Sequence, residues 1–197
     1  MPNPGAVIPF TPGQHTHLIP YLAAIHASCI THDRTIATFL PPLSHEKLLA
    51  WWKDRIAEVA DGSRLIYVLL RDDGSDDEEA AHHHVAVSPK GPEVVGVVML
   101  AMPFSETGAF RAAVEKLLVH ASWRRRGGAT RLIDILEREA LHRGKTLLTL
   151  DTETGSPAES LFLKLGYAEL GRIPRYGLSP AGELKDETFF YKQLDNT

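Results

Sequence analysis

The sequence predicts one α/β domain, because apolar runs typical of strands alternate along it with segments whose apolar residues recur at helical spacing. Its 197 residues are 44% hydrophobic and 23% charged, which is typical of a globular chain that buries one core. The sequence contains no internal repeat and no linker that would divide it. We therefore expect residues 1–197 to form a single domain.

Composition and charge exclude several classes of function. The single cysteine, Cys29, excludes an internal disulfide, and the segment Met1–Gly5 lacks the basic start and apolar run of a secretory signal, so we expect a cytoplasmic protein. No apolar stretch approaches the roughly 20 residues that a membrane helix needs. A formal net charge of -4 argues against a nucleic-acid surface that covers the whole molecule. We expect neither membrane nor nucleic-acid partners, and a small molecule is the more natural ligand.

Two helices are expected in the first third of the chain. Apolar residues recur at helical spacing over 18–30 and again over 48–59, and Ser44 is a candidate N-cap for the second helix. The segment 31–42 between them is irregular, and Pro41-Pro42 prevents the two helices from joining. The repeating apolar residues are Leu18, Leu22, Ile25, Cys29 and Ile30 in the first helix and Leu48, Leu49, Trp52, Ile56 and Val59 in the second.

The remainder of the chain alternates between strands and helices. Runs rich in Val and Leu with few polar interruptions are typical of strands covered on both faces. A helix over Ala129–Arg143 is predicted to end at Gly144, and a second helix over Ser156–Leu165 carries Pro157 at a tolerated early position. The expected strands are Arg64–Leu70, Glu93–Met102, Ala112–His120, Thr146–Leu150, a strand from Gly166-Tyr167 toward Leu170, and Thr188–Leu194.

An acidic segment interrupts the pattern and is followed by adjacent histidines. Residues 71–79 are rich in Asp and Glu and poor in apolar side chains, and His82, His83 and His84 follow. We expect a mobile, solvated loop over about 71–92. The histidines raise the alternative of a metal site, but consecutive side chains of an extended loop diverge and no second cluster of ligands accompanies them. We therefore predict that the protein holds no metal.

A basic glycine loop joins the expected strand Ala112–His120 to the expected helix Ala129–Arg143. Lys116–Val119 ends the strand, Arg124-Arg125-Arg126 supplies positive charge, and Gly127-Gly128 lets the backbone approach a ligand closely. The first turn of the helix adds unpaired N–H groups and the positive end of the helix dipole. A pyrophosphate is the natural occupant of such an anion site. The alternative is a solvated basic turn that merely begins a helix.

These residues resemble the signature of a known family. Arg124-x-x-Gly127-x-Ala129 matches the Arg/Gln-x-x-Gly-x-Gly/Ala pattern of the GNAT N-acetyltransferases, and Leu161–Tyr167 is similar to the family's Leu-Tyr-x-Lys-Leu-Gly-Phe segment. The resemblance covers residues 64–194 in the family's order of elements. It implies a central mixed, mostly antiparallel and twisted sheet that is flanked by helices and splayed between its fourth and fifth strands. It also implies acetyl-CoA as the co-substrate.

The last third of the chain resembles one branch of the family, the tabtoxin resistance acetyltransferases, which modify a small toxin. The matches lie in Leu150–Glu159, Pro174-x-Tyr176, Gly182-x-Leu184 and Phe190–Leu194. This resemblance implies transfer of an acetyl group to the amine of a small amino-acid-like or toxin-like molecule. Acetylation of a protein or peptide, and a non-catalytic acyl-CoA-binding module, remain the alternatives. A homodimer is also left open.

The family resemblance assigns the CoA site to three segments. The backbone of Leu117–Val119 would pair with the pantetheine arm as an added strand, and the amides of the loop that follows would hold the pyrophosphate. Lys164 would lie near the CoA, although a solvated helical face is an equal alternative. The implied CoA-binding residues are Leu117, Leu118, Val119, Arg124, Arg125, Arg126, Gly127, Gly128, Ala129, Thr130, Ser156, Phe162 and Lys164.

The reaction needs a base, because an amine with an ordinary pKa near ~10 is charged at neutral pH. Asp151 is the first candidate, since it follows the strand at which the family's sheet opens, and the alternative is an Asp that caps a turn. Glu115 is the second, because a carboxylate in an apolar strand is costly unless it serves a site or faces water. Glu153 and His120 are weaker candidates, and each is better explained as a solvent-facing residue.

The acid that protonates the leaving thiolate is not evident. Phe162 occupies the place of a tyrosine that does this in many GNAT enzymes, and phenylalanine has no proton to donate. Tyr167 and Tyr176 are candidates to replace it: Tyr167 fits a core position, and Tyr176, in an expected turn over Pro174–Gly177, fits the wall of the substrate site. Otherwise solvent protonates the thiolate, the thiolate leaves unprotonated, or catalysis is weak.

Overall fold

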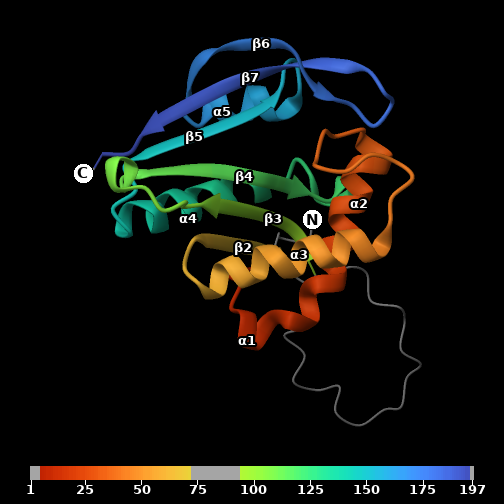
Figure 1. Ribbon diagram of the computed structural model, residues 1–197, viewed down its shortest axis with the longest axis horizontal. Coiled ribbons are helices and arrows are strands. Elements are labelled where there is room, and N and C mark those ends of the chain that lie inside the picture. The colour runs from red at the N-terminus through yellow and green to blue at the C-terminus, as the bar shows by residue number, and fades with distance from the viewer. Residues whose placement is uncertain (1–4, 72–93, 196–197) are drawn as a thin grey trace.

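A seven-stranded mixed sheet forms the centre of the computed structural model, which describes residues 5–71 and 94–195 (Figure 1). Within these ranges the strands lie in the order β1-β2-β3-β4-β5-β7-β6. The pair β4 and β5 is parallel, and every other neighbouring pair is antiparallel, so the sheet is mostly antiparallel, as predicted. The strands are β1 (Val7–Pro9), β2 (Arg64–Leu70), β3 (Val94–Ala101), β4 (Arg111–Val119), β5 (Leu147–Glu153), β6 (Ala168–Leu178) and β7 (Leu184–Gln193).

Helices cover both faces of the sheet. Helices α2 and α3 pack on one face of β2, β3 and β4, where Leu22, Trp52 and Val97 belong to one core cluster. Helix α4 packs on the opposite face of the same strands, and α5 covers β5 and β7 on that side, where Phe162 meets Phe190. The helices are α1 (Pro12–His15), α2 (Ile19–Asp33), α3 (His45–Ala60), α4 (Gly128–His142) and α5 (Pro157–Lys164).

Local sequence sets two helix starts as expected. Ser44 caps α3, because its Oγ accepts a hydrogen bond of 3.3 Å from Lys47 N. Helix α5 begins in the same way: Ser156 Oγ accepts from Glu159 N at 3.3 Å, and the Glu159 carboxylate accepts from Gly155 N at 2.7 Å. This reciprocal capping holds the first turn of α5 in place.

The sheet opens between β4 and β5. Their pairing is confined to Arg111–Ala113 against Leu147–Thr149, and beyond these residues the two strands separate (Figure 1). A bulge in β4 follows, where the ladder with β3 shifts register and Lys116 takes a left-handed backbone with a φ of 51°. The splay therefore lies between the fourth and fifth strands, as predicted, and no strand of the described residues pairs with the facing edges of β4 and β5 beyond it.

The C-terminal hairpin is longer than expected. Strand β6 runs past Leu170, where the expected strand ended, and β7 begins at Leu184 rather than at Thr188. The expectation of a turn over Pro174–Gly177 was wrong, because this segment lies within β6 at a register shift where Arg175 has a φ of 55°. Strand β6 is an edge strand, and a proline is tolerated there. The short elements β1 and α1 contain too few residues for their periodicity to be recognised.

Some expectations concern residues outside the described ranges. The loop expected over about 71–92 lies there apart from Arg71, as do His82, His83 and His84. Within residues 5–71 and 94–195, no group of three or more His, Cys, Asp or Glu side chains could hold a metal ion. In the same ranges, no helix has both the length and the apolar character needed to cross a membrane. The single domain over residues 1–197 and the cytoplasmic location stay predictions.

A fully buried histidine lies between α2 and α3. His26 Nε2 forms a hydrogen bond of 2.7 Å with the carbonyl oxygen of Ala37, and its ring packs edge-on against Trp51 and Trp52. Burial disfavours the charged ring and lowers the pKa of His26 to about 4, although the Ala37 carbonyl opposes this shift. The imidazole is therefore neutral in the folded protein near neutral pH.

We predict that His26 makes the protein less stable in mild acid. An unfolded histidine has a pKa near ~6.5, so below that pH the unfolded chain binds a proton that the folded protein excludes until about pH 4. The free energy of unfolding should therefore fall by about 2 kcal/mol from this residue alone between pH ~7 and ~5. Urea titrations at both pH values should show a smaller loss for His26→Gln, whose amide can still donate to Ala37. An equal loss in both proteins would contradict this prediction.

Candidate active site

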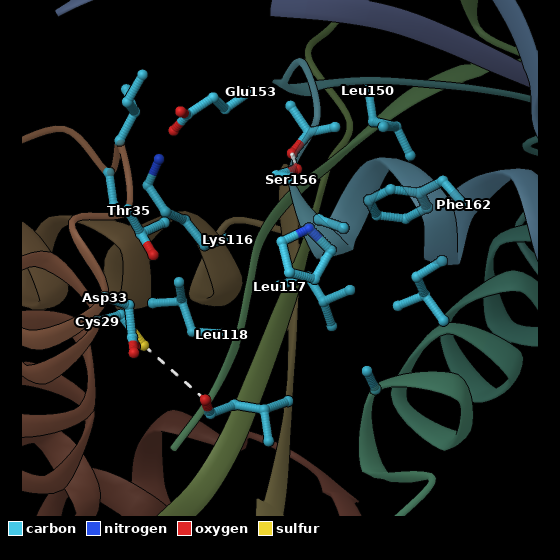
Figure 2. A pocket seen from close by; sticks show the side chains of 18 of the residues that line it. Cys29, Asp33, Thr35, Lys116, Leu117, Leu118, Leu150, Glu153, Ser156 and Phe162 are labelled. Carbon is cyan, nitrogen blue, oxygen red and sulfur yellow. Dashed lines mark hydrogen bonds between the residues drawn. The ribbon is translucent and has the colours of Figure 1, made fainter. Parts of the chain in front are cut away.

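A cavity of about 1110 Å³ lies where the sheet opens (Figure 2). Its walls come from β4 and β5, from the N-terminal ends of α4 and α5, and from α3 with the connection that precedes it. Two parts of the cavity differ in chemistry. One part is lined by β4 and by the loop into α4, and the other is lined by charged side chains of β4, β5, β7 and α3.

The β4 edge of the cavity offers backbone groups without a neighbouring strand. Leu117, Leu118 and Val119 line the cavity beyond the point where β4 pairs with β5. The N–H and C=O groups of an open strand edge bind an extended ligand in the same way as they bind another strand. This edge is therefore suited to an extended ligand that contains amides.

The loop from β4 to α4 presents N–H groups to the same part of the cavity. Gly127 precedes α4 with a left-handed φ of 77°, and no side chain of residues 5–71 or 94–195 caps the helix. Gly128, Ala129 and Thr130 begin α4 and line the cavity together with Arg125. Unpaired N–H groups, the helix dipole and a cationic side chain make this loop an anion site.

The arginines of this loop have different surroundings. Arg124 ties the loop to α2, because its Nε donates to the carbonyl oxygen of Val119 at 2.9 Å and its Nη2 forms an ion pair with Asp33. Arg126 stacks over the Trp123 ring, with its guanidinium carbon 4.8 Å from the ring centre, and does not line the cavity. Arg124 does line it, beside the loop that it holds.

A pair of carboxyl groups lies in the second part of the cavity. Asp151 projects from β5, and Glu187 lies beside it on β7 with only 6% of its surface exposed. Burial, a hydrogen bond between the two side chains and the charge of Asp151 raise the pKa of Glu187 to about 7, with a further contribution from Glu153. The charge of Lys116 opposes this shift. Glu187 therefore takes up and releases a proton near neutral pH and can exchange it with a bound ligand.

Glu187 was missed in the sequence because it lay outside the expected strand Thr188–Leu194. In the structure, β7 begins earlier and pairs Glu187 directly with Glu153. Opposite residues of an antiparallel pair share a face, so the register places both acids on the face that carries Asp151. The turn residues Ser179–Gly182 were the available signal, because a strand commonly starts directly after such a turn.

Glu115 also lines the cavity, but an arginine holds its charge. Arg64 Nη1 donates to Glu115 Oε2 at 2.7 Å, and Arg64 Nε donates to Glu58. Burial alone would lower the pKa of Arg64, but its hydrogen bonds to the two carboxylates raise it. The Glu115 carboxylate is therefore already held by a cation of the protein.

The central part of the chain matches a family model. Residues 46–167 match the model described as the acetyltransferase (GNAT) family, and they include the loop Arg124–Ala129. The chain belongs to the GNAT family of acetyltransferases. This membership confirms the family resemblance and the prediction of an acetyl-CoA-dependent acetyltransferase. The closer resemblance to the tabtoxin resistance acetyltransferases stays a prediction.

Solved structures share this fold over almost the whole chain. YncA from Salmonella typhimurium, solved with its cofactor acetyl-CoA, is 17% identical, with 98% of this chain and 95% of that chain covered and a TM-score of 0.68. A protein assigned as a phosphinothricin N-acetyltransferase is 18% identical over 97% of this chain and 100% of that chain, with a TM-score of 0.71. A ribosomal-protein-alanine N-acetyltransferase from Brucella melitensis is 20% identical over 96% of this chain and 99% of that chain, with a TM-score of 0.66. At these identities the structures establish the fold.

Helix α5 of the acetyltransferase brings two of its three predicted CoA-binding residues to the cavity. Ser156 and Phe162 line it (Figure 2). Phe162 is buried, with its ring edge-on against Tyr167. Ser156 Oγ lies 3.3 Å from Thr152 Oγ1. Lys164 is exposed and does not line the cavity, in agreement with the alternative of a solvated helical face.

Neither tyrosine considered as a proton donor lines the cavity of the acetyltransferase. Tyr167 is buried in the core, and this burial raises its pKa. Tyr176 is 55% exposed on β6, where it packs edge-on against Phe189. Of the weaker candidates for the base, Glu153 lines the cavity and His120 does not.

We predict that Gly128→Val weakens CoA binding to the acetyltransferase by at least about tenfold. The new side chain would occupy space beside the N–H groups that begin α4, and its Cβ would come within 2.7 Å of Leu69 Cδ2. Calorimetric titration with CoA gives the dissociation constant, and the melting temperature shows whether the variant folds. Gly13→Val is the matched control, because a Cβ at Gly13 meets nothing within 4 Å and Gly13 does not line the cavity. Unchanged affinity in a folded Gly128→Val protein would remove this loop from the CoA site.

Proposed function

We propose that the protein transfers the acetyl group of acetyl-CoA to the amine of a small molecule. The observation that carries this proposal is that the Asp151 and Glu187 pair lines the same cavity as the open edge Leu117–Val119. CoA bound along that edge, with its pyrophosphate over the loop Arg125–Thr130, would direct its thioester toward the carboxyl groups. One cavity therefore offers a site for the acyl donor and a proton acceptor for the amine.

The surroundings of the carboxyl pair support a small acceptor. Ile36, in the connection between α2 and α3, and Glu187 on β7 both lie against Gly177 of β6. The connection therefore reaches across the splay to the C-terminal half of the sheet, beside the carboxyl groups. A connection that covers one side of the splay in this way leaves less room for a polypeptide than an uncovered groove.

The carboxyl pair would prepare the amine for attack. A bound ammonium group passes its proton to the pair formed by Asp151 and Glu187, and the neutral nitrogen then attacks the thioester carbon. The N–C bond forms and the C–S bond breaks through a tetrahedral intermediate, whose nitrogen releases its second proton to solvent as CoA leaves as a thiolate. A backbone N–H of β4 near Leu118 would stabilise the oxyanion, a contribution that is typically ~10²–10³ in rate.

The leaving thiolate needs no dedicated protein acid in this mechanism. Phe162 lines the cavity without a proton to donate, and the two tyrosines considered above lie elsewhere. A thiol with an ordinary pKa near ~8.5 departs readily as a thiolate, and solvent then protonates it. The reaction therefore depends on the carboxyl pair rather than on an acid at position 162.

We predict that small amines are acetylated with a higher kcat/KM than peptides. The release of CoA should be measured with a thiol reagent against amines, amino acids and peptides that begin with the same amino acids. Preferred turnover of the peptides would replace the small-molecule function by protein N-acetylation. Tight CoA binding without transfer to any acceptor would favour the non-catalytic acyl-CoA-binding module.

We predict that the two carboxyl groups respond differently to substitution. In the unmodified protein, kcat/KM should fall as the pH drops below about 7, because Glu187 takes up a proton. Glu187→Gln should lower kcat/KM by about 10²–10⁴ and remove this pH dependence. Asp151→Asn should instead shift the pH below which kcat/KM falls to a lower value, because the substitution removes a charge that raises the pKa of Glu187.

Glu106→Gln serves as the control for these profiles, since Glu106 is exposed and does not line the cavity. It should leave the pH profile unchanged. If Glu187→Gln keeps the unmodified profile, Glu187 is not the base. Asp151 alone, the first candidate from the sequence, would then carry that role.

A further inference from the structure

Arg55 of α3 lines the cavity with one N–H group unsatisfied. Its Nη2 pairs with Glu58 Oε1 at 2.5 Å, and its guanidinium carbon lies 5.2 Å from the centre of the Trp51 ring. Its Nε is buried and has no hydrogen-bond partner among the described residues. A buried N–H without an acceptor costs roughly 1–3 kcal/mol, so an oxygen of a bound ligand would be stabilised there.

Lys116 places a second cation against the same indole ring. Its Nζ lies 5.8 Å from the centre of the Trp51 ring, and the side chain points into the cavity (Figure 2). No carboxylate of the described residues lies within ion-pair distance of this nitrogen, although Glu115, Asp151 and Glu187 are near enough to act on its charge. Burial lowers the pKa of Lys116, and a bound anion would oppose that effect.

We infer that Arg55, Lys116 and Trp51 bind a carboxylate group of the acceptor, so that the substrate is a small amine that also carries a carboxylate. This inference rests on the proposed function and names the substrate class of the same site. Guanidinium and ammonium groups are the usual partners of a carboxylate, and the indole gives the ligand a flat apolar wall. The carboxylate would hold the acceptor while its amine faces the acids.

The proposed acceptor needs a carboxyl group of the protein near its amine and a cation of the protein near its carboxylate, and the cavity offers these groups on different elements. Asp151 and Glu187 lie on β5 and β7, whereas Arg55 and Lys116 lie on α3 and β4. A molecule with an amine and a carboxylate a few bonds apart would place each group against the opposite charge. A simple monoamine would leave Arg55 Nε without a hydrogen-bond partner. The site should therefore prefer amines that carry a carboxylate over simple monoamines.

The test compares acceptors that differ only in the carboxylate. L-Methionine, L-lysine and L-glutamate are each matched with the α-carboxamide and with the decarboxylated amine. We expect kcat/KM to favour the amino acid by about tenfold or more in at least one set. Arg55→Gln and Lys116→Gln should each raise KM for that amino acid by about tenfold or more relative to KM for its decarboxylated amine. The comparison is made within each variant, because loss of the Lys116 charge also raises the pKa of Glu187 and so affects both acceptors alike.

Arg138→Gln and Lys53→Gln are the matched controls, because both cations are exposed and neither lines the cavity. These two controls should leave KM and kcat/KM unchanged for the amino acids and for their decarboxylated amines. All four variants should keep their affinity for CoA. Decarboxylated amines that are acetylated as well as the amino acids would overturn the inference and leave the proposed function intact.

Calorimetric titration of the same acceptors into the protein with CoA bound keeps the inference testable without turnover. If an amino acid binds to the unmodified protein and this binding is lost in Arg55→Gln, the carboxylate site is supported. Should no acetyl transfer be found in that case, only the proposed function fails. If no carboxylated amine binds or reacts, the carboxylate site is wrong.

Discussion

The β4–β5 ladder ends after Ala113 and Thr149, and the cavity exists because of that ending. Strands that stayed paired along their whole length would bury the backbone groups of Leu117–Val119 in a continuous sheet. Separated strands leave these groups in need of other partners, since backbone N–H and C=O groups are rarely left unpaired. The bulge at Lys116 lies directly beyond the last paired residues and turns this side chain into the cavity. One break in a ladder therefore creates both an edge for CoA and space for an acceptor.

A chain of ion pairs determines which charges remain available in that space. Arg55 pairs with Glu58, which also accepts from Arg64, and Arg64 in turn donates to Glu115. The chain runs from α3 through β2 to β4 and balances two cations against two carboxylates. The carboxylates of Glu58 and Glu115 are therefore held by arginines, whereas Arg55 Nε still has no hydrogen-bond partner among the described residues. The carboxyl groups of Asp151 and Glu187 lie outside this chain and are left to interact with the amine.

Much of the fold followed from local patterns in the sequence. The serine cap at Ser44, the glycines at 127 and 128, and the apolar periodicity each act within a few residues, so the limits of the helices were predicted closely. Asp151 was proposed because it follows the strand at which the sheet opens in the family that the sequence resembles. Its partner Glu187 was not found, since the contact depends on how far the last hairpin extends and on its register with β5.

Contacts between residues far apart in the sequence also explain the other differences between the predicted site and the observed one. Glu115 looked like a free carboxylate because its partner Arg64 lies 51 residues earlier in the chain. Arg55 reaches the cavity only through the packing of α3 against the sheet, and helical periodicity marks it merely as a polar position. Tyr176 seemed to belong to the substrate wall, but the edge strand β6 carries it outside the cavity.

A crystal structure with CoA bound would test most directly whether the splay forms the catalytic site. The pantetheine arm should lie along Leu117–Val119 with hydrogen bonds to the β4 backbone, and the pyrophosphate should rest on residues 125–130. The sulfur should then face the cavity end that holds Asp151 and Glu187. CoA bound elsewhere, or a closed β4–β5 ladder with no ligand between the strands, would contradict this arrangement.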